Sequence, residues 1–417
     1  DLAVGIPGDL GTRNERWTAM PAVEYRASDA WTLRSSALVS EQSQRYRFGQ
    51  LFRFVDDQQI GGRASGEWRR GATRLTPLVH LSRFDHLERA STGSRPVRGS
   101  GDRDVQSLLE AEVTGTTLLR SAVVDAGVEA RRERITSDRI PGDARVLDAV
   151  EGYAQLTTAR GPVTLVPGLR LVEHSVFGGF AAPRVAAMWR PRAELALRGS
   201  VGRGFRAPDF KELYLSFANP AIGYAVVGNP DLRPERSTSL QLGAEWTPSF
   251  GWLRIGLFDN DFRDFIAFTG DPSGAFTYSN VERGSTRGVE TEVSVARGAW
   301  RVDVGHAYLE ARDDRGRPLP SRPAHSGRVG LNAPLPGAGA LAATWVVTGR
   351  TPITVGLELE STEEQPTFER LDLKATLPLR AGLRLLAGVD NALDREVGRQ
   401  WPGFTGRLVY AGVNWRR

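Results

Sequence analysis

Apolar residues stand at every second position over long stretches of this chain. In residues 240–246 the even positions hold Leu, Leu, Ala and Trp, and Gln241, Gly243 and Glu245 stand between them. Successive side chains of a β-strand point to opposite faces of the sheet, so this pattern predicts a strand with one apolar and one polar face. The same alternation runs through residues 124–131, 289–295, 300–304, 371–377 and 409–415.

The predicted strands are long, and the connections between them alternate in length. Each strand runs for about 9–15 residues, which exceeds the ~5–6 usual in soluble proteins and is enough for a tilted strand to cross a bilayer. Long connections are expected near residues 205–235, 269–278, 312–323, 351–366 and 392–405. Short connections are expected near residues 27–30, 70–73, 114–117, 159–162, 248–251, 297–299, 334–339 and 378–381. Short turns on one rim and long loops on the other are typical of an outer-membrane β-barrel whose turns face the periplasm.

Tryptophan gives a separate indication of a membrane. If the short turns face the periplasm, most of the 10 tryptophans fall at the periplasmic ends of their strands. Indole is amphipathic and prefers the membrane–water interface, so this bias predicts an aromatic girdle. The predicted girdle consists of Trp31, Trp68, Trp189, Trp246, Trp252, Trp300 and Trp415.

The number of strands bears on the domain organisation. The alternation gives about nineteen strands, whereas bacterial single-chain barrels have an even number. The first strand, near residues 15–26, descends from the outer rim, so at least one ascending strand is expected before Asp1. We therefore expect an all-β fold, a transmembrane antiparallel β-barrel, in which residues 1–417 form one N-terminally incomplete barrel domain.

Composition argues against several other classes of protein. The chain has 0 Cys, so disulfides and cysteine chemistry are impossible. Its net charge is +5, but Arg is spread along the chain and interleaved with Asp and Glu, unlike the basic patch of a nucleic-acid-binding protein. No apolar run approaches the ~20 residues that a membrane-spanning helix needs.

No motif points to an enzyme or a metal centre. The Gly-x-Ser-x-Gly pattern of serine hydrolases is absent. None of the 5 histidines stands in a metal-ligand spacing such as His-Glu-x-x-His. The histidines are His80, His86, His174, His306 and His325. We therefore expect no catalytic residue, no cofactor and no metal site.

Several segments, in order along the chain, resemble the TonB-dependent receptor family. The most specific are residues 202–214 (GRGFRAPDFKELY), 228–243 (GNPDLRPERSTSLQLG), 280–290 (NVERGSTRGVE, with Gly284 where the family has Ala) and 388–397 (GVDNALDREV). Residues 165–171 and 183–191 match an upstream hairpin of the family. The resemblance covers residues from about Val146 to Trp415, and residues 1–145 fit by strand pattern only.

The resemblance implies a fold and a function. It implies a 22-stranded outer-membrane barrel, filled by an N-terminal plug and energised by a periplasmic segment that contacts TonB. Neither the plug nor that segment is found in this sequence, and about three strands are expected to be missing. The implied role in the Gram-negative outer membrane is import of a metal chelate, a ferric siderophore first and cobalamin second. The implied partners are lipid, TonB and the chelate, with no nucleic acid, and we expect a monomer.

The longest predicted loop carries the candidate ligand contacts. Pro230 and Pro234 fix the backbone of its return segment, which favours an ordered turn. Its aromatic and Arg side chains could bind a ligand by stacking or cation–π contacts, or pack as a core. The candidates are Phe205, Arg206, Phe210, Tyr214, Phe217, Tyr224 and Arg233. Charged residues on the polar strand faces either line a transport path, or pair with one another or with the plug; these are Glu290, Glu292, Arg301, Asp303, Asp372 and Lys374.

Three other functions stay open at this stage. A plugless passive porin predicts that no plug is encoded upstream of Asp1. An outer-membrane hydrolase predicts an essential Ser or Asp on the outer rim. A soluble all-β binding protein predicts that the chain dissolves without detergent.

Overall fold

The structure is a computed structural model that describes residues 13–48, 51–142, 144–219, 224–270, 275–354, 362–379, 382–396 and 406–415. In these ranges it contains 24 strands, one short α-helix and one 3-10 turn. Twenty-two strands belong to one sheet, and β20 (Thr351–Thr354) pairs with β21 (Thr362–Gln365) in a second. The all-β prediction is confirmed. No helix in the described part of the chain is long and apolar enough to span a membrane.

The chain divides into two compact units, and each is described by itself. The first comprises residues 1–185, 202–236 and 264–280, and the second comprises residues 186–201, 237–263 and 281–417. Five strands contribute residues to both units. They are β10 (Gly178–Arg192), β11 (Leu195–Arg206), β14 (Glu235–Trp246), β15 (Gly251–Gly270) and β16 (Phe276–Arg297).

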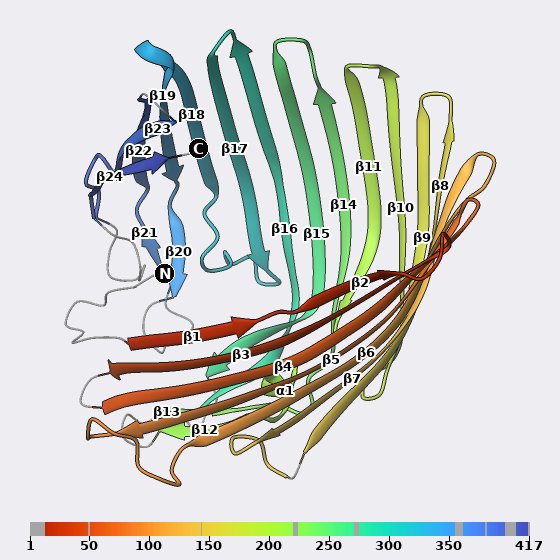
Figure 1. Ribbon diagram of the computed structural model, residues 1–417, viewed down its shortest axis with the longest axis vertical. Coiled ribbons are helices and arrows are strands. Elements are labelled where there is room, and N and C mark those ends of the chain that lie inside the picture. Colours follow the sequence, from red (N-terminus) through yellow and green to blue (C-terminus); the bar gives the residue numbers. More distant parts are fainter. Residues whose placement is uncertain are drawn as a thin grey trace. The chain divides into compact units, whose positions relative to one another are not determined.

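The first unit contains a run of antiparallel strands in chain order (Figure 1). Both β1 and β2 pair with β3, and each strand from β3 to β9 pairs with the next one in the chain. These strands are β1 (Arg13–Ala19), β2 (Ala22–Arg26), β3 (Trp31–Phe48), β4 (Leu51–Arg70), β5 (Thr73–Ser91), β6 (Asp102–Leu118), β7 (Ala122–Ser137), β8 (Arg145–Arg160) and β9 (Val163–His174).

The second unit repeats this arrangement. Residues 284–297 of β16 pair with β17, and the antiparallel ladder then runs through β18, β19, β22, β23 and β24. These strands are β17 (Trp300–Asp313), β18 (His325–Leu335), β19 (Gly339–Thr348), β22 (Phe368–Pro378), β23 (Leu383–Asp390) and β24 (Leu408–Trp415). The 3-10 turn η2 (Pro336–Ala338) joins β18 to β19.

The strand count agrees with the sequence. Both β1 and β2 are parts of one segment, and four further strands are only four residues long: β12 (Ser216–Asn219), β13 (Tyr224–Val227), β20 and β21. That leaves nineteen long strands in the described residues, as the alternation predicts. Most predicted short turns are found, for example where Arg70 and Thr73 pair across Gly71 at φ 57°, a conformation that glycine adopts without strain.

One predicted turn was wrong, and some connections are not testable. Residues 114–117 lie inside β6, where Thr117 pairs with Val124, and the turn follows at residues 119–121. The three threonines in this segment favour an extended chain, so they continue the strand instead of ending it. The connections predicted near residues 205–235, 269–278, 351–366, 378–381 and 392–405 lie partly outside the described residues.

Each strand exposes its apolar face. On β17, Val302 and Val304 are 39% and 42% exposed, whereas Asp303 between them is paired with Arg301 on the other face. Equivalent exposed apolar residues of the first unit include Val79, Leu81, Leu109, Val113, Val128, Leu169 and Leu171. Exposed apolar patches on this scale mark a surface that meets lipid or another apolar partner. The compact cores of the described residues are small and lie under the long loop of the first unit.

Candidate ligand-binding site

The connection between β11 and β14 forms an ordered platform in the first unit. It contains α1 (Phe210–Tyr214) and the antiparallel pair of β12 and β13. Asp209 caps the helix by accepting a hydrogen bond of 2.8 Å from the Glu212 amide, and the Glu212 carboxylate accepts one of 2.8 Å from the Asp209 amide. A helix of five residues is unstable alone, so its surroundings must hold it.

Arg206 ties the two ends of this connection together. Its guanidinium donates two hydrogen bonds of 2.7 Å to Glu235, at the start of β14. It also donates bonds of 3.0 and 3.1 Å to Glu212 in α1. The Ile266 amide donates a further bond of 2.8 Å to Glu235. Bidentate pairing with two carboxylates gives Arg206 a fixed geometry, so its first role is to hold the platform.

The return segment is fixed by hydrogen bonds between side-chain amides and backbone groups, and the prolines predict such an ordered turn. The Asn280 side chain accepts from the Arg233 amide at 2.8 Å and donates to the Arg233 carbonyl at 2.9 Å. The Asn229 side chain donates to the Tyr278 carbonyl at 2.9 Å. The Arg233 guanidinium itself contacts Asp264 at 2.7 Å while its side chain stays 65% exposed.

Two aromatic candidates serve in packing. Phe210 is 8% exposed and packs against Ile135, Ile140 and Leu147. Tyr214 contacts this cluster and a second one, formed by Leu213, Leu232 and Ile266. The buried ring of Phe210 therefore anchors α1, which is the core alternative that the sequence left open.

Arginines cover two of the aromatic candidates, Tyr214 and Phe217. The Arg145 guanidinium lies 4.7 Å from the ring centre of Tyr214, and that of Arg139 lies 4.9 Å from that of Phe217. Arg139 also contacts Glu88 at 2.9 Å and Asp102 at 2.7 Å. Burial lowers the pKa of the Arg139 guanidinium, but its hydrogen bonds to Asp102 and Glu88 outweigh this and raise it. The side chain of Tyr224, at the start of β13, lies outside the described residues.

A cavity of about 460 Å³ lies beside this platform in the first unit. Phe205 and Phe210 of the predicted set line it, and Phe205 stacks on Phe180 with ring centres 4.7 Å apart. Arg203 also lines it and has no carboxylate partner among the described residues. The cavity therefore places a guanidinium without an ion-pair partner in the described ranges next to a pair of stacked rings, and the Asp209 carboxylate also lines it.

The sequence reasoning missed several residues of this cavity. Arg131 lies on β7, Arg170 and His174 lie on β9, and Phe180 lies on β10, so these residues share no local motif. Arg131 is paired with Glu133 at 2.8 Å, and Arg170 is paired with Glu151. The only signal in the sequence is their strand parity, because each belongs to the polar face of its strand.

Most of the charged residues predicted for the polar faces pair with near neighbours. Arg301 contacts Asp303 at 2.9 Å, and Asp372 contacts Arg370 at 2.9 Å. Glu292 lies 3.9 Å from Arg254. Among the described residues, Glu290 and Lys374 form no ion pair. The pairing alternative therefore accounts for four of the six residues.

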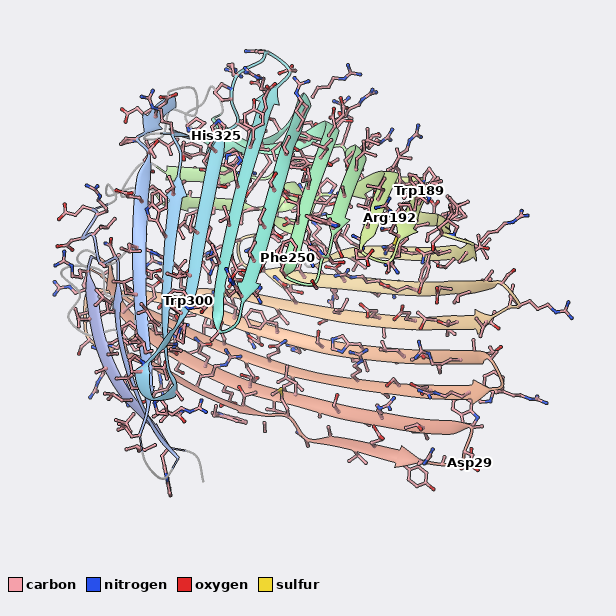
Figure 2. The ribbon with its side chains drawn as sticks, turned by 90° about the horizontal axis from the view of Figure 1, so that it is seen from above. Asp29, Trp189, Arg192, Phe250, Trp300 and His325 are labelled. Carbon is pink, nitrogen blue, oxygen red and sulfur yellow. The ribbon has the colours of Figure 1, made fainter. Side chains whose placement is uncertain are left out.

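The predicted girdle tryptophans lie where their strands begin or end. Trp31 pairs directly with Trp68 across β3 and β4, and Trp300 pairs with Arg297 across the tight turn before β17. Figure 2 shows Trp189 and Trp300 near the turn ends of their strands. Trp189, Trp246 and Trp415 are all exposed.

Trp252 differs from the other predicted girdle residues. The Arg254 guanidinium lies 4.3 Å from its ring centre, and Arg254 contacts Glu245 at 3.4 Å. Glu245 belongs to the polar face of β14, so Trp252 lies on the polar face of β15. Its indole therefore packs under a cation, on the face opposite to Leu253 and Ile255.

Two tryptophans outside the predicted girdle share another arrangement. The indole of Trp17 donates to Glu41 at 3.0 Å, and that of Trp345 donates to Glu369 at 3.0 Å. Both lie away from the short turns of their strands. An apolar ring with a bonded N–H suits a membrane interface, so these residues fit a second, outer girdle.

Comparison with known proteins identifies the family. The family model described as TonB dependent receptor-like, beta-barrel matches residues 4–392. An iron-regulated outer membrane virulence protein of Vibrio cholerae is 25% identical over 280 residues, which cover 59% of this chain and 41% of the relative. The vitamin B12 transporter BtuB of Vibrio vulnificus is 26% identical over 278 residues, which cover 64% and 43%. The chain thus spans less than half the length of these two relatives.

The fold agrees with this match. A variant of the ferric enterobactin receptor PfeA of Pseudomonas aeruginosa superposes with a TM-score of 0.77 at 15% identity, over 96% of this chain and 69% of the receptor. The relatives are outer-membrane proteins of Gram-negative bacteria. The chain belongs to the family of TonB-dependent receptor β-barrels of the Gram-negative outer membrane.

Proposed function

We propose that residues 1–417 form the membrane wall and outer loops of a receptor that imports a metal chelate, such as a ferric siderophore. The family match over residues 4–392 supports the receptor class. The observation that supports a metal chelate as the cargo is the cavity lined by Arg203, which has no ion-pair partner in the described part of the chain, and by the stacked rings of Phe180 and Phe205. A chelate that is anionic and presents flat unsaturated groups would suit a guanidinium and aromatic faces.

The platform explains how such a ligand could be held firmly. Arg206, Glu212 and Glu235 fix α1, and the core under Phe210 and Leu213 supports it. A rigid platform loses little conformational entropy when a ligand binds, so more of the contact energy appears as affinity. Arg233, which is largely exposed, and Phe205 are the predicted residues best placed for direct contact.

Transport needs parts that the resemblance implies beyond the barrel. A plug would close the lumen, and TonB would pull on it after the ligand has bound, so that the barrel itself catalyses no reaction. The lipid contacts come from the exposed faces of the strands, and we expect a monomer. Cobalamin is the second candidate cargo, because 278 residues align with a vitamin B12 transporter at 26% identity.

Uptake by cells that carry the full-length receptor tests this proposal. Cells that lack their own siderophore receptors are given ⁵⁵Fe-labelled catecholate and hydroxamate siderophores, or ⁵⁷Co-labelled cobalamin. We expect saturable uptake of one ferric siderophore that stops when tonB is deleted. Arg203→Ala lowers the affinity about tenfold, as expected for the loss of one charge-assisted contact, and Arg160→Ala, at a turn, serves as the matched control.

Other outcomes would replace the proposal. Unsaturable passage without TonB indicates a passive porin. Saturable uptake of cobalamin alone indicates the second candidate. Unchanged siderophore affinity in Arg203→Ala moves the ligand away from this cavity.

A further inference from the structure

Two histidines that are separated in the sequence meet on one face of the second unit. Tyr308 pairs with His325 and His306 pairs with Gly327 across β17 and β18. Directly paired residues point to the same face, so His306 and His325 are diagonal neighbours there. Their rings stack with centres 5.5 Å apart and planes inclined by 25°. Figure 2 shows His325 at the end of these strands opposite to Trp300.

The ring nitrogens are spaced as two ligands of one metal ion would be. His306 Nε2 lies 3.3 Å from His325 Nδ1. Two nitrogens bound at ~2.05 Å to one tetrahedral ion lie roughly 3.3 Å apart. Hydrogen bonds from N–H groups cluster at shorter distances, near ~2.9–3.0 Å. The spacing therefore fits a shared ion as well as it fits a hydrogen bond from one ring to the other.

Apart from their contact with each other, the two imidazoles have no hydrogen-bond partner among the described residues. No carboxylate contacts either ring among the described residues, unlike His86, whose Nδ1 is 2.6 Å from Asp57. Tyr308 lies beside His325 with ring centres 5.1 Å apart. No group of three or more His, Cys, Asp or Glu in the described part of the chain could hold a metal. The donor set is thus two imidazoles completed by solvent.

A cavity leaves room for the remaining ligands. It has a volume of about 740 Å³ and is lined by both histidines and Tyr308. Beyond Tyr308 the same face carries Glu310, which contacts Arg312 at 3.1 Å. Tyr308 therefore lies near the outer edge of the apolar band on β17, and water in the cavity can reach the two rings from that rim.

We propose that His306 and His325 bind one divalent transition-metal ion, with water in its other positions. Imidazole suits Zn²⁺, Ni²⁺ and Cu²⁺, and Cu²⁺ binds most strongly of the three by the general order of affinities. The ion would crosslink β17 and β18 next to the long connection between them. The site takes the bare ion and lies in the second unit, so it is independent of the proposed chelate cavity.

Copper binding by the full-length receptor in detergent tests the site. Cu²⁺ is titrated by calorimetry, and electron paramagnetic resonance reports the number of nitrogen ligands. We expect one ion per chain with two equivalent nitrogens. Each of His306→Ala and His325→Ala weakens binding at least about tenfold, because loss of a direct ligand costs no less than loss of an outer-shell partner.

The control variant is His80→Ala, which removes a histidine of β5 and should bind as the wild type does. Heat-modified gel mobility checks that all three variants have folded. Equal binding by His306→Ala, His325→Ala and the wild type would overturn the proposal. A spectrum with a single nitrogen ligand in the wild type would also overturn it.

Discussion

Arg206 and Glu235 stand 29 positions apart in the chain and are joined by two hydrogen bonds of 2.7 Å. The same guanidinium binds Glu212, so one residue at the end of β11 fixes both α1 and the start of β14. The sequence suggested Arg206 as a ligand contact, whereas in the structure its guanidinium binds Glu212 and Glu235. The platform between β11 and β14 is held closed by this arginine.

Arg206→Ala is expected to loosen the platform without unfolding the sheet. The carboxylates of Glu212 and Glu235, which are mostly shielded from solvent, lose their cation. The free energy of opening the platform should fall by about 2 kcal/mol, a figure that allows for the exposed side of Arg206. Hydrogen exchange should therefore speed up in residues 209–216 by more than tenfold and stay unchanged in β3–β7. Arg301→Ala, which removes an exposed pair with Asp303, is the matched control. Unchanged exchange in α1 would show that Arg206 is dispensable.

Gly228→Ala is expected to displace α1 by direct collision. A β-carbon at this position would lie 2.6 Å from the Tyr214 nitrogen and 2.7 Å from the Leu215 nitrogen, and backbone atoms cannot turn away as a side chain can. The hydrogen bond from the Gly228 amide to the Leu215 carbonyl would then be strained. Limited proteolysis within residues 207–234 should increase severalfold. Gly256→Ala, where the new methyl group meets open space, should behave as the wild type does.

The two faces of the sheet predict different roles for two tryptophans. Trp300 is 53% exposed at a turn, whereas Trp252 is stacked under Arg254 on the polar face. In vesicles of brominated lipid, bromine quenches only indoles that touch the bilayer. Trp300→Phe should lower the quenchable share of the emission, and Trp252→Phe should leave it constant. Equal losses in both variants would mean that Trp252 also meets lipid.

Much of the fold follows from the sequence because its cause is local. A strand that separates lipid from a polar interior must alternate, so residues such as Val302 and Asp303 reveal their faces directly. Prolines 230 and 234 likewise indicated an ordered turn before the structure showed its bonds to Asn280. The turn predicted at residues 114–117 failed because Thr and Gly occur in strands as well as in turns.

The candidate ligand site can be predicted only in part from the sequence, because its residues are far apart in the chain. Phe205 and Phe210 were found because they stand in one aromatic-rich loop, but the loop alone does not distinguish a buried ring from an exposed one. Arg131, Arg170 and Phe180 come from three strands and meet only through the register of the sheet. The contact between His306 and His325 could not be predicted for the same reason, because the distance between them depends on how β17 and β18 align.

The height of the apolar face of β17 can be compared with the thickness of a membrane. Trp300 and Tyr308 lie on the same face of β17, eight residues apart, with Val304 midway. Eight residues of strand span roughly 27 Å, and a tilt of ~40° leaves about 21 Å across the membrane. This is close to the ~25 Å apolar band of outer-membrane barrels, so Val304 falls near its middle.

Unfolding of Val304→Arg and Gly305→Arg in lipid vesicles tests the central claim most directly, since these neighbours point to opposite faces. Val304 pairs with Val293 and Val329 on the apolar face, whereas a side chain built on Gly305 meets open space on the polar face. In urea titrations we predict that Val304→Arg loses about 2–4 kcal/mol of unfolding free energy and that Gly305→Arg stays within about 0.5 kcal/mol of the wild type. Equal stability of the two variants, or a larger loss in Gly305→Arg, would contradict the placement of the alternating apolar face in lipid.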